Sequence, residues 1–415
     1  MNSTKNTLFT PLFFSIFMPF ALGYFVSVLL GSANAAMSPI LVETFSLSPA
    51  DLGFMTSVYL IAFGLAQFPI GVFLDRYGAR KTLAPSLIFA VAGAFVFAFS
   101  NNMTSLVISR AISGIGLSGC LMAAFKAYAE KFPPERLPFI YSIQCLFGGI
   151  GGMAATKPIL IAVTIINWRT LFIVLGFFTL FVAALIWFIV PKDEENRKNG
   201  ETALFTLLRS MLAYFKDPRF ILVAPVVTAA QSVMFAYLYL WISPWMRDVA
   251  GTGNSDTGMF MMTASAGAAL GYFLNGVLAD WLNKRGLFSW EKLYLYSGVF
   301  ISLFLALIAV INGKAAALIW GPVMFLSTMS MISFPIIRRL YHNNEVGRVM
   351  SLLNFTIFLA SFLLQWLVGV ILNMYPVVGG QFSAEGHRIC VWIIAAINMA
   401  AAIHLYFGLR RIGKI

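Results

Sequence analysis

Charged residues are scarce in this sequence. Only 11% of the 415 residues are Asp, Glu, Lys or Arg, whereas soluble domains carry about 25%. Hydrophobic residues make up 60% of the chain, and the mean hydropathy is +0.85. Because a single soluble core stops growing at about 250–300 residues, a soluble fold could not bury this much apolar surface. The composition excludes an ordinary soluble domain and indicates that lipid surrounds most of the chain.

Cysteine is scarce as well, and all three cysteines fall within apolar stretches: Cys120, Cys145 and Cys390. Their number and spacing suit neither a disulfide framework nor a metal site, so we expect them to be small buried hydrophobic residues. The sequence also lacks a GxxxxGK[ST] phosphate loop and a Ser-His-Asp arrangement. It therefore predicts no enzyme, no metal and no cofactor.

Histidine is the third scarce residue, and the three copies are scattered at or near the ends of apolar segments: His342, His387 and His404. Trp245 also lies near the end of a segment. Tryptophan is enriched at membrane–water interfaces. We therefore expect these four residues at the membrane interface.

Long apolar segments dominate what is present. Each can cross a hydrocarbon core of about 30 Å, which needs roughly 20 helical residues. There are twelve: 12–42, 51–74, 82–100, 103–129, 137–165, 169–190, 219–246, 255–279, 290–312, 315–337, 349–374 and 388–409. The sequence predicts an all-α integral membrane protein with 12 transmembrane helices.

One long hydrophilic interruption, between Pro191 and Pro218, divides the segments six plus six. It contains a weakly amphipathic piece, Leu204 to Phe215, which is typical of an interfacial helix. We therefore predict a six-helix bundle over residues 1–191 and another over 219–415. Residues 192–218 form the linker between them.

The basic residues are strongly biased to one side of the predicted topology. Of the 28 Lys and Arg residues, three lie inside segments and only four fall in loops on the second side: Arg169, Arg247, Lys314 and Arg388. The positive-inside rule then places both termini in the cytoplasm. The net charge of +12 is thus explained by topology, and we expect no nucleic-acid partner.

A charged turn, GVFLDRYGARK at 71–81, joins the second and third segments. A weaker copy, with Gly276, Asp280 and a basic turn, ends the second segment of the C-terminal half. Glycine, then aspartate four residues on, then a basic turn, resembles the signature loop of the major facilitator superfamily of secondary transporters. The resemblance implies two similar six-helix halves with a substrate site between them near the midplane.

In that family the signature loop works as a conformational latch. The resemblance assigns this role to six residues: Gly71, Asp75, Arg76, Gly78, Arg80 and Asp280. Asp75 would lie against the N-terminal end of the eleventh helix, where an anion is stabilised by the helix dipole. The contact would form only when the cytoplasmic side is closed, and would therefore bias the conformational equilibrium. Gly71 would let the second helix approach a neighbour closely. The alternative is that the basic residues only anchor the topology.

The fourth and fifth segments carry two further features. RAISGIG, beginning at Arg110, resembles a second family motif, whose arginine is linked to proton transfer in related transporters. The alternative for Arg110 is a structural hydrogen bond to helix carbonyls. GGIGGMAATKP at 148–158 lacks the Gly-Pro dipeptide of the antiporter motif, which weakens a drug-antiporter interpretation. Pro158 is expected to kink this segment.

Three cations inside segments predict a site for an anion. Arg110 and Lys157 lie deep, whereas Lys126 is near enough to an end that its ammonium can also snorkel to the surface. Polar and aromatic residues at mid-depth complete the predicted lining: Tyr24, Asn34, Tyr59, Gln144, Gln231, Tyr237, Trp241 and Asn354. For each of these, the alternative is a hydrogen bond that only packs helices together.

No carboxylate lies in the middle of any segment, which argues against a site for cationic drugs. We therefore expect a secondary active transporter that works by alternating access and moves a small organic anion or zwitterion, such as a carboxylate, an amino acid or a chelate. Proton-coupled uptake by a monomer in the bacterial inner membrane is the favoured hypothesis. The alternative is a proton-driven efflux antiporter for drugs or metabolites.

Overall fold

The computed structural model describes residues 11–191, 212–311, 313–378, 380–411 and 413. Most of the predicted interfacial helix at 204–215 therefore lies outside the described residues. Its last residues enter a short 3-10 turn, η2 (Ala213–Lys216).

The N-terminal half contains seven helices: α1 (Pro11–Phe45), α2 (Pro49–Ala98), α3 (Met103–Leu117), α4 (Cys120–Lys131), α5 (Leu137–Ala154), α6 (Lys157–Ile165) and α7 (Trp168–Ile189). They make six spans. α2 crosses twice because it bends at Gly78, whose φ of 80° is a conformation that favours glycine. α3 with α4, and α5 with α6, are single spans interrupted once, the second at the predicted kink before Pro158.

The C-terminal half also makes six spans. Its segments are α9 (Pro218–Ala236), the π-helical turn η3 (Tyr237–Trp241), α10 (Ile242–Asp248), α11 (Asn254–Lys284), α12 (Trp290–Val310), α13 (Lys314–Met329), η4 (Ser330–Ile332), α14 (Ser333–Leu340), α15 (Asn343–Leu372) and α16 (Ala384–Arg411). The described residues contain 11 stretches apolar and long enough to cross a membrane, one of them the doubly crossing α2. These match the twelve predicted segments.

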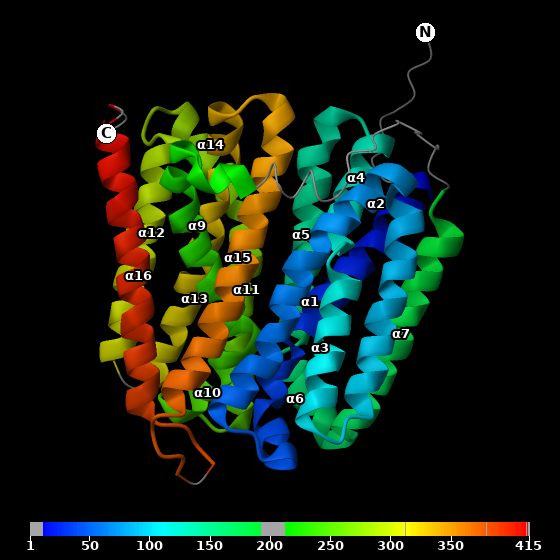
Figure 1. The fold of residues 1–415 in the computed structure, drawn as a ribbon, viewed down its shortest axis with the longest axis vertical. Coiled ribbons are helices and arrows are strands. Elements are labelled where there is room, and N and C mark those ends of the chain that lie inside the picture. The colour runs from blue at the N-terminus through cyan, green and yellow to red at the C-terminus, as the bar shows by residue number, and fades with distance from the viewer. Residues whose placement is uncertain (1–10, 192–211, 312, 379, 412, 414–415) are drawn as a thin grey trace.

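The two halves stand side by side, α1–α7 against α9–α16 (Figure 1). One end of the molecule, at the top of Figure 1, carries α14 and the end of α16, with Arg338 and Arg410. We call it the basic face. The other end carries α6 and α10, and we call it the opposite face.

The halves are in tight contact toward the opposite face, through α2 and α15. A Cβ added to Gly369 would collide with the carbonyl oxygen of Pro49, so glycine is needed for this approach. Aromatic pairs continue the contact inward, with ring centroids 4.7 Å apart for Phe63 and Phe358. Phe68, nearer the basic face, still meets Phe355 at 5.4 Å. The structure is therefore closed on the opposite face.

Candidate functional site

Arg110 of α3 is a fully buried cation between the helices of the N-terminal half. It is 1% exposed, and one guanidinium nitrogen donates to the carbonyls of Leu30 (3.2 Å) and Gly31 (3.4 Å). The guanidinium carbon lies 5.0 Å from the centre of the Tyr59 ring. The ion pairs of the described residues include none to Arg110, and its Nε has no hydrogen-bond partner. A buried charge without a counter-ion is costly, so this position favours an anion nearby.

The RAISGIG motif explains how α3 comes so close to its neighbours. A Cβ on Gly114 would stand 2.5 Å from the carbonyl oxygen of Tyr59, too close for any side chain. Gly116 makes the same kind of approach to Ala90 in the second half of α2. These glycines allow α3 to pack directly on both crossings of α2, and so they place Tyr59 over Arg110.

Tyr239, in the π-helical turn η3, brings the C-terminal half to this position. The centroid of its ring lies 6.0 Å from that of Tyr59. The same ring packs so closely on Gly31 that a Cβ at that position would collide with it. The sequence predicts Tyr237 and Trp241 as site residues, but not Tyr239. Single π-helical turns inside α-helices are rare and often occur at functional sites. This turn, which only the structure reveals, is the feature that indicates Tyr239.

Two more tyrosines join this region. Tyr24 of α1 packs its ring on Gly148 of α5, where a Cβ would collide with it. The next residue of α5, Gly149, packs directly on Ala269 of α11, three residues before Tyr272. The Tyr272 hydroxyl is 3.5 Å from Oε1 of Gln231. We call Tyr24, Tyr59, Tyr239 and Tyr272 the tyrosine cluster. With Arg110 beside it, the cluster suits a small anion that carries hydroxyl groups.

Four of the predicted lining residues lie inside one half and are held by contacts there. Gln144 donates to the carbonyl of Phe20 and accepts from the Tyr128 hydroxyl. Gln231 donates to the carbonyl of Ser327 and to the Ser330 hydroxyl. The other two are Asn34, whose amide points to the Met55 sulfur, and Tyr237, which stacks on Trp320. All four are fully buried, and their role in binding the substrate stays a prediction.

Trp241 and Asn354 are placed differently. Trp241 is fully buried, donates its indole N–H to the carbonyl of Gln365 at 2.8 Å, and lies beside Gly53 of α2. It therefore belongs to the contact that closes the opposite face. Asn354 is half-buried on α15, and no hydrogen bond of its side chain is found among the described residues.

Lys157 is the first residue of α6, at the break after α5. Its side chain is half-buried, and its backbone packs against Gly258 in the first turns of α11. Lys157 therefore lies where the two halves meet near the opposite face, between that face and the tyrosine cluster.

Lys126 lies toward the basic face, where its ammonium is 3.1 Å from Asp75 and 3.3 Å from Glu130. In this conformation, two carboxylates pair with a cation that the sequence predicts for the substrate site. In this conformation the Asp75 side chain is 84% exposed, and it pairs with Lys126 of its own half. Its contact with the start of α15 stays a prediction for the conformation that is closed on the basic face.

The remaining latch residues differ in what they contact. Arg80 donates to the carbonyl of Val190 at 3.1 Å, Arg76 stacks on Tyr77, and Asp280 pairs with Lys284 at 3.4 Å. Gly78 is required by its positive φ. Gly71 is not required here, because an added Cβ would meet only the Met122 methyl, at 3.7 Å.

The expectation that the histidines and Trp245 are interface residues is wrong for two of the four. Trp245 is fully buried and packs edge-on against Trp320. His387 is also fully buried, beside Asp248. His342 and His404 are exposed, as expected.

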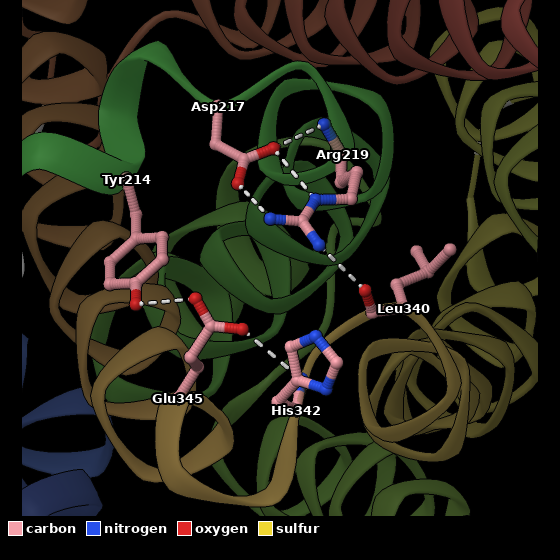
Figure 2. Close-up of polar contacts among 6 residues, drawn as sticks. All are labelled: Tyr214, Asp217, Arg219, Leu340, His342 and Glu345. Atoms are coloured by element: carbon pink, nitrogen blue, oxygen red, sulfur yellow. Dashed lines mark hydrogen bonds and ion pairs between the residues drawn. The ribbon is translucent and has the colours of Figure 1, made fainter.

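Figure 2 shows a polar network on the basic face, where the linker enters the C-terminal half. Arg219 donates to both oxygens of the Asp217 carboxylate and to the carbonyl of Leu340. Tyr214 donates to Glu345 at 3.1 Å, and Glu345 also accepts from the backbone of His342. The network ties the last residues of the linker to the start of α15. The hydrogen bonds from Arg219 lower the pKa of Asp217.

An Asp217→Asn variant is expected to be less stable than the wild type at neutral pH. Because the folded state depresses the pKa of this carboxylate, the stabilisation is present above the ordinary aspartate pKa of about 3.9 and is lost as the pH falls through the depressed value. Thermal unfolding in detergent should therefore show a wild-type advantage that shrinks toward acid. An Asp256→Asn control breaks an exposed pair with Lys314 and should change little. A wild-type advantage that persists unchanged to pH 3 would contradict this explanation.

Comparisons with known proteins agree with this architecture. The family model of the Major Facilitator Superfamily matches residues 20–365. A probable L-galactonate transporter of Escherichia coli (strain K12) is 23% identical over 391 residues, which are 89% of this chain and 83% of that protein. The hexuronate transporter of Bacillus subtilis (strain 168) is 24% identical over 390 residues, 90% and 91% of the two chains.

A solved structure has the same fold. It is a bacterial homolog to the human lysosomal transporter Spinster, with a TM-score of 0.76 at 15% identity, covering 97% of this chain and 98% of that one. The predicted all-α fold of twelve membrane helices in two bundles is confirmed. The family model matches most of the length of this chain, which shows that the chain belongs to the major facilitator superfamily and is a transporter.

Proposed function

We propose that the protein imports a small organic anion, of the hydroxylated carboxylate class, together with protons. The observation that carries the proposal is Arg110, a buried cation with no ion-pair partner among the described residues, which lies beside the tyrosine cluster. A carboxylate complements the cation, and hydroxyl groups can both donate to and accept from tyrosine. The two relatives compared above, named for galactonate and hexuronate, support this class.

The proposed mechanism is alternating access by a monomer in a bacterial inner membrane. The bias of Lys and Arg supports a cytoplasmic location for the basic face and both termini. The closed opposite face and the exposed Asp75 then correspond to a conformation open to the cytoplasm. We retain Lys157 as a second cation, on the opposite-face side of the site. In this proposal Asp75 exchanges Lys126 for the start of α15 when the cytoplasmic side closes.

Ligand-induced stabilisation of the purified protein tests the cargo class. A ligand at 100 times its Kd raises the free energy of unfolding by about 2.7 kcal/mol, so binding should raise the Tm. We expect D-galactonate and D-glucuronate to raise the Tm, and neutral D-galactose or tetraphenylphosphonium to leave it unchanged. A Lys157→Ala variant should weaken the shift. A Tm raised by the cation or the neutral sugar, and not by either acid, would contradict the proposed class.

A further inference from the structure

A buried pair of ionisable side chains, His387 and Asp248, lies near the opposite face. Nε2 of His387 is 3.1 Å from Oδ2 of Asp248, and the two side chains are 0% and 1% exposed. The backbone N–H of Phe382 donates to the same oxygen at 3.3 Å. The other atoms of the pair, Nδ1 and Oδ1, are buried without hydrogen-bond partners. A carboxylate in these surroundings is costly unless a positive charge compensates it.

At their opposite-face ends, the elements around the pair carry these charged groups: Arg247 on α10, Glu385 and Arg388 on α16, Glu43 on α1, and Asp256 on α11 with Lys314 on α13. Glu43 is exposed, and Asp256 is bonded to Lys314. Helices α9, α12 and α15 carry their charged side chains only at their basic-face ends. Arg247 makes no ion pair with Asp248, although it is the adjacent residue. The described ion pairs therefore give Asp248 no partner other than His387.

The pair joins α10, which contacts the N-terminal half, to α16. Asp248 ends α10, which follows the π-helical turn that carries Tyr239. Both η3 and α10 contact α1 of the other half. His387 belongs to the first turn of α16. The pair thus fastens the part of the seventh span that contacts the N-terminal half to the last span.

We propose that His387 and Asp248 form a proton-binding site that controls the closure of the opposite face. With a proton on the imidazole, the two charges cancel and the pair can stay buried. Without it, the buried Asp248 carboxylate loses the one cation that lies within ion-pair distance of it among the described residues, which favours access of water and opening of that face. Histidine is the side chain whose charge most readily changes between about pH 5 and 8, a range that spans the acidic exterior and the cytoplasm of a proton-driven importer. The proposed function, proton-coupled import, enters this inference only as the direction in which protons cross the membrane.

Spin labels on the opposite face test the proposal. Thr44 of α1 and Ser255 of α11 are exposed there, on different halves. Both would be labelled as cysteines after replacement of the three native cysteines, which are all free. In proteoliposomes, double electron–electron resonance should show longer distances between the two labels as the pH rises from 5 to 8.

His387→Gln can still donate to Asp248 but cannot take up a proton, so its distances should not depend on pH. The matched control is His404→Gln, an exposed histidine on the same helix, which should keep the wild-type shift. Asp248→Asn should also lose the shift, and it serves as the second variant if His387→Gln does not fold.

A wild-type pH shift in folded His387→Gln or Asp248→Asn would overturn the site. Uptake driven by a pH gradient, measured in the same proteoliposomes, separates this outcome from failure of the proposed function. Gradient-driven uptake together with a retained shift in His387→Gln overturns the site alone. A shift that needs His387, without any gradient-driven uptake by the wild type, overturns the coupling alone.

Discussion

A Gly369→Val variant is expected to fold and to lose most of its transport. A side chain at this position would collide with the carbonyl oxygen of Pro49 across the two halves. In the proposed mechanism, residue 369 and Pro49 separate when the opposite face opens. Because overpacking costs about 1–3 kcal/mol, the equilibrium between the two conformations should shift about 5- to 150-fold toward the one open on the opposite face.

The distance between labels at Thr44 and Ser255 measures this shift directly, and initial rates of uptake measure its consequence. The control is Gly276→Val on α11, because an added Cβ at Gly276 meets no atom within 4 Å. It should transport at nearly the wild-type rate. Wild-type transport by Gly369→Val would show that closure of this face does not need the contact.

An Arg110→Gln variant is expected to bind the organic anion about 10- to 150-fold more weakly, since hydrogen bonds to charged groups contribute about 1.5–3 kcal/mol. Arg110→Lys should recover only part of the affinity, because an ammonium keeps the charge but has fewer donors than the guanidinium, one nitrogen of which donates to the carbonyls of Leu30 and Gly31. Titration calorimetry on the folded protein gives the Kd.

Arg169→Gln is the matched control for a purely structural role. Arg169 also donates to two backbone carbonyls, of Ala98 and Ser100, but it belongs to α7, near the opposite-face ends of the helices. Its loss should lower the Tm and leave the Kd unchanged. If Arg110→Gln behaves in the same way, with a lower Tm and a wild-type Kd, then Arg110 only packs helices and the proposed anion site is wrong.

The fold could be predicted from the sequence because membrane spans depend on segment length and hydropathy, which are local properties. The turn at Gly78 and the position of Arg110 deep inside a span could also be predicted, since a glycine inside a charged turn and an arginine inside an apolar run are local anomalies. The break before Pro158 followed from the missing backbone N–H and the ring of proline.

The directions in which the side chains of the seventh span point could not be predicted from local sequence properties. In a regular helix, residues 237, 239 and 241 point in directions set by 3.6 residues per turn, but the π-helical turn changes that register. It leaves Tyr237 and Trp241 buried and presents Tyr239 to Tyr59. Nothing in the local sequence signals the extra residue in the turn.

Long-range pairing was the other limit. Lys126 and Asp75 are 51 residues apart, and His387 and Asp248 are 139 residues apart. Residues at segment ends are usually exposed, and that rule misplaced His387. Its burial depends on how α16 packs against α10, which is a property of the tertiary structure.

The most direct test of the central claim is uptake of radiolabelled D-galactonate or D-glucuronate into proteoliposomes under an imposed pH gradient. With an acidic exterior, we expect at least one of the two acids to accumulate above its external concentration, and a protonophore to abolish the accumulation. The Arg110→Gln protein should show neither effect. Equilibration of both acids without accumulation, or accumulation only when the interior is acidic, would contradict proton-coupled import of an organic anion.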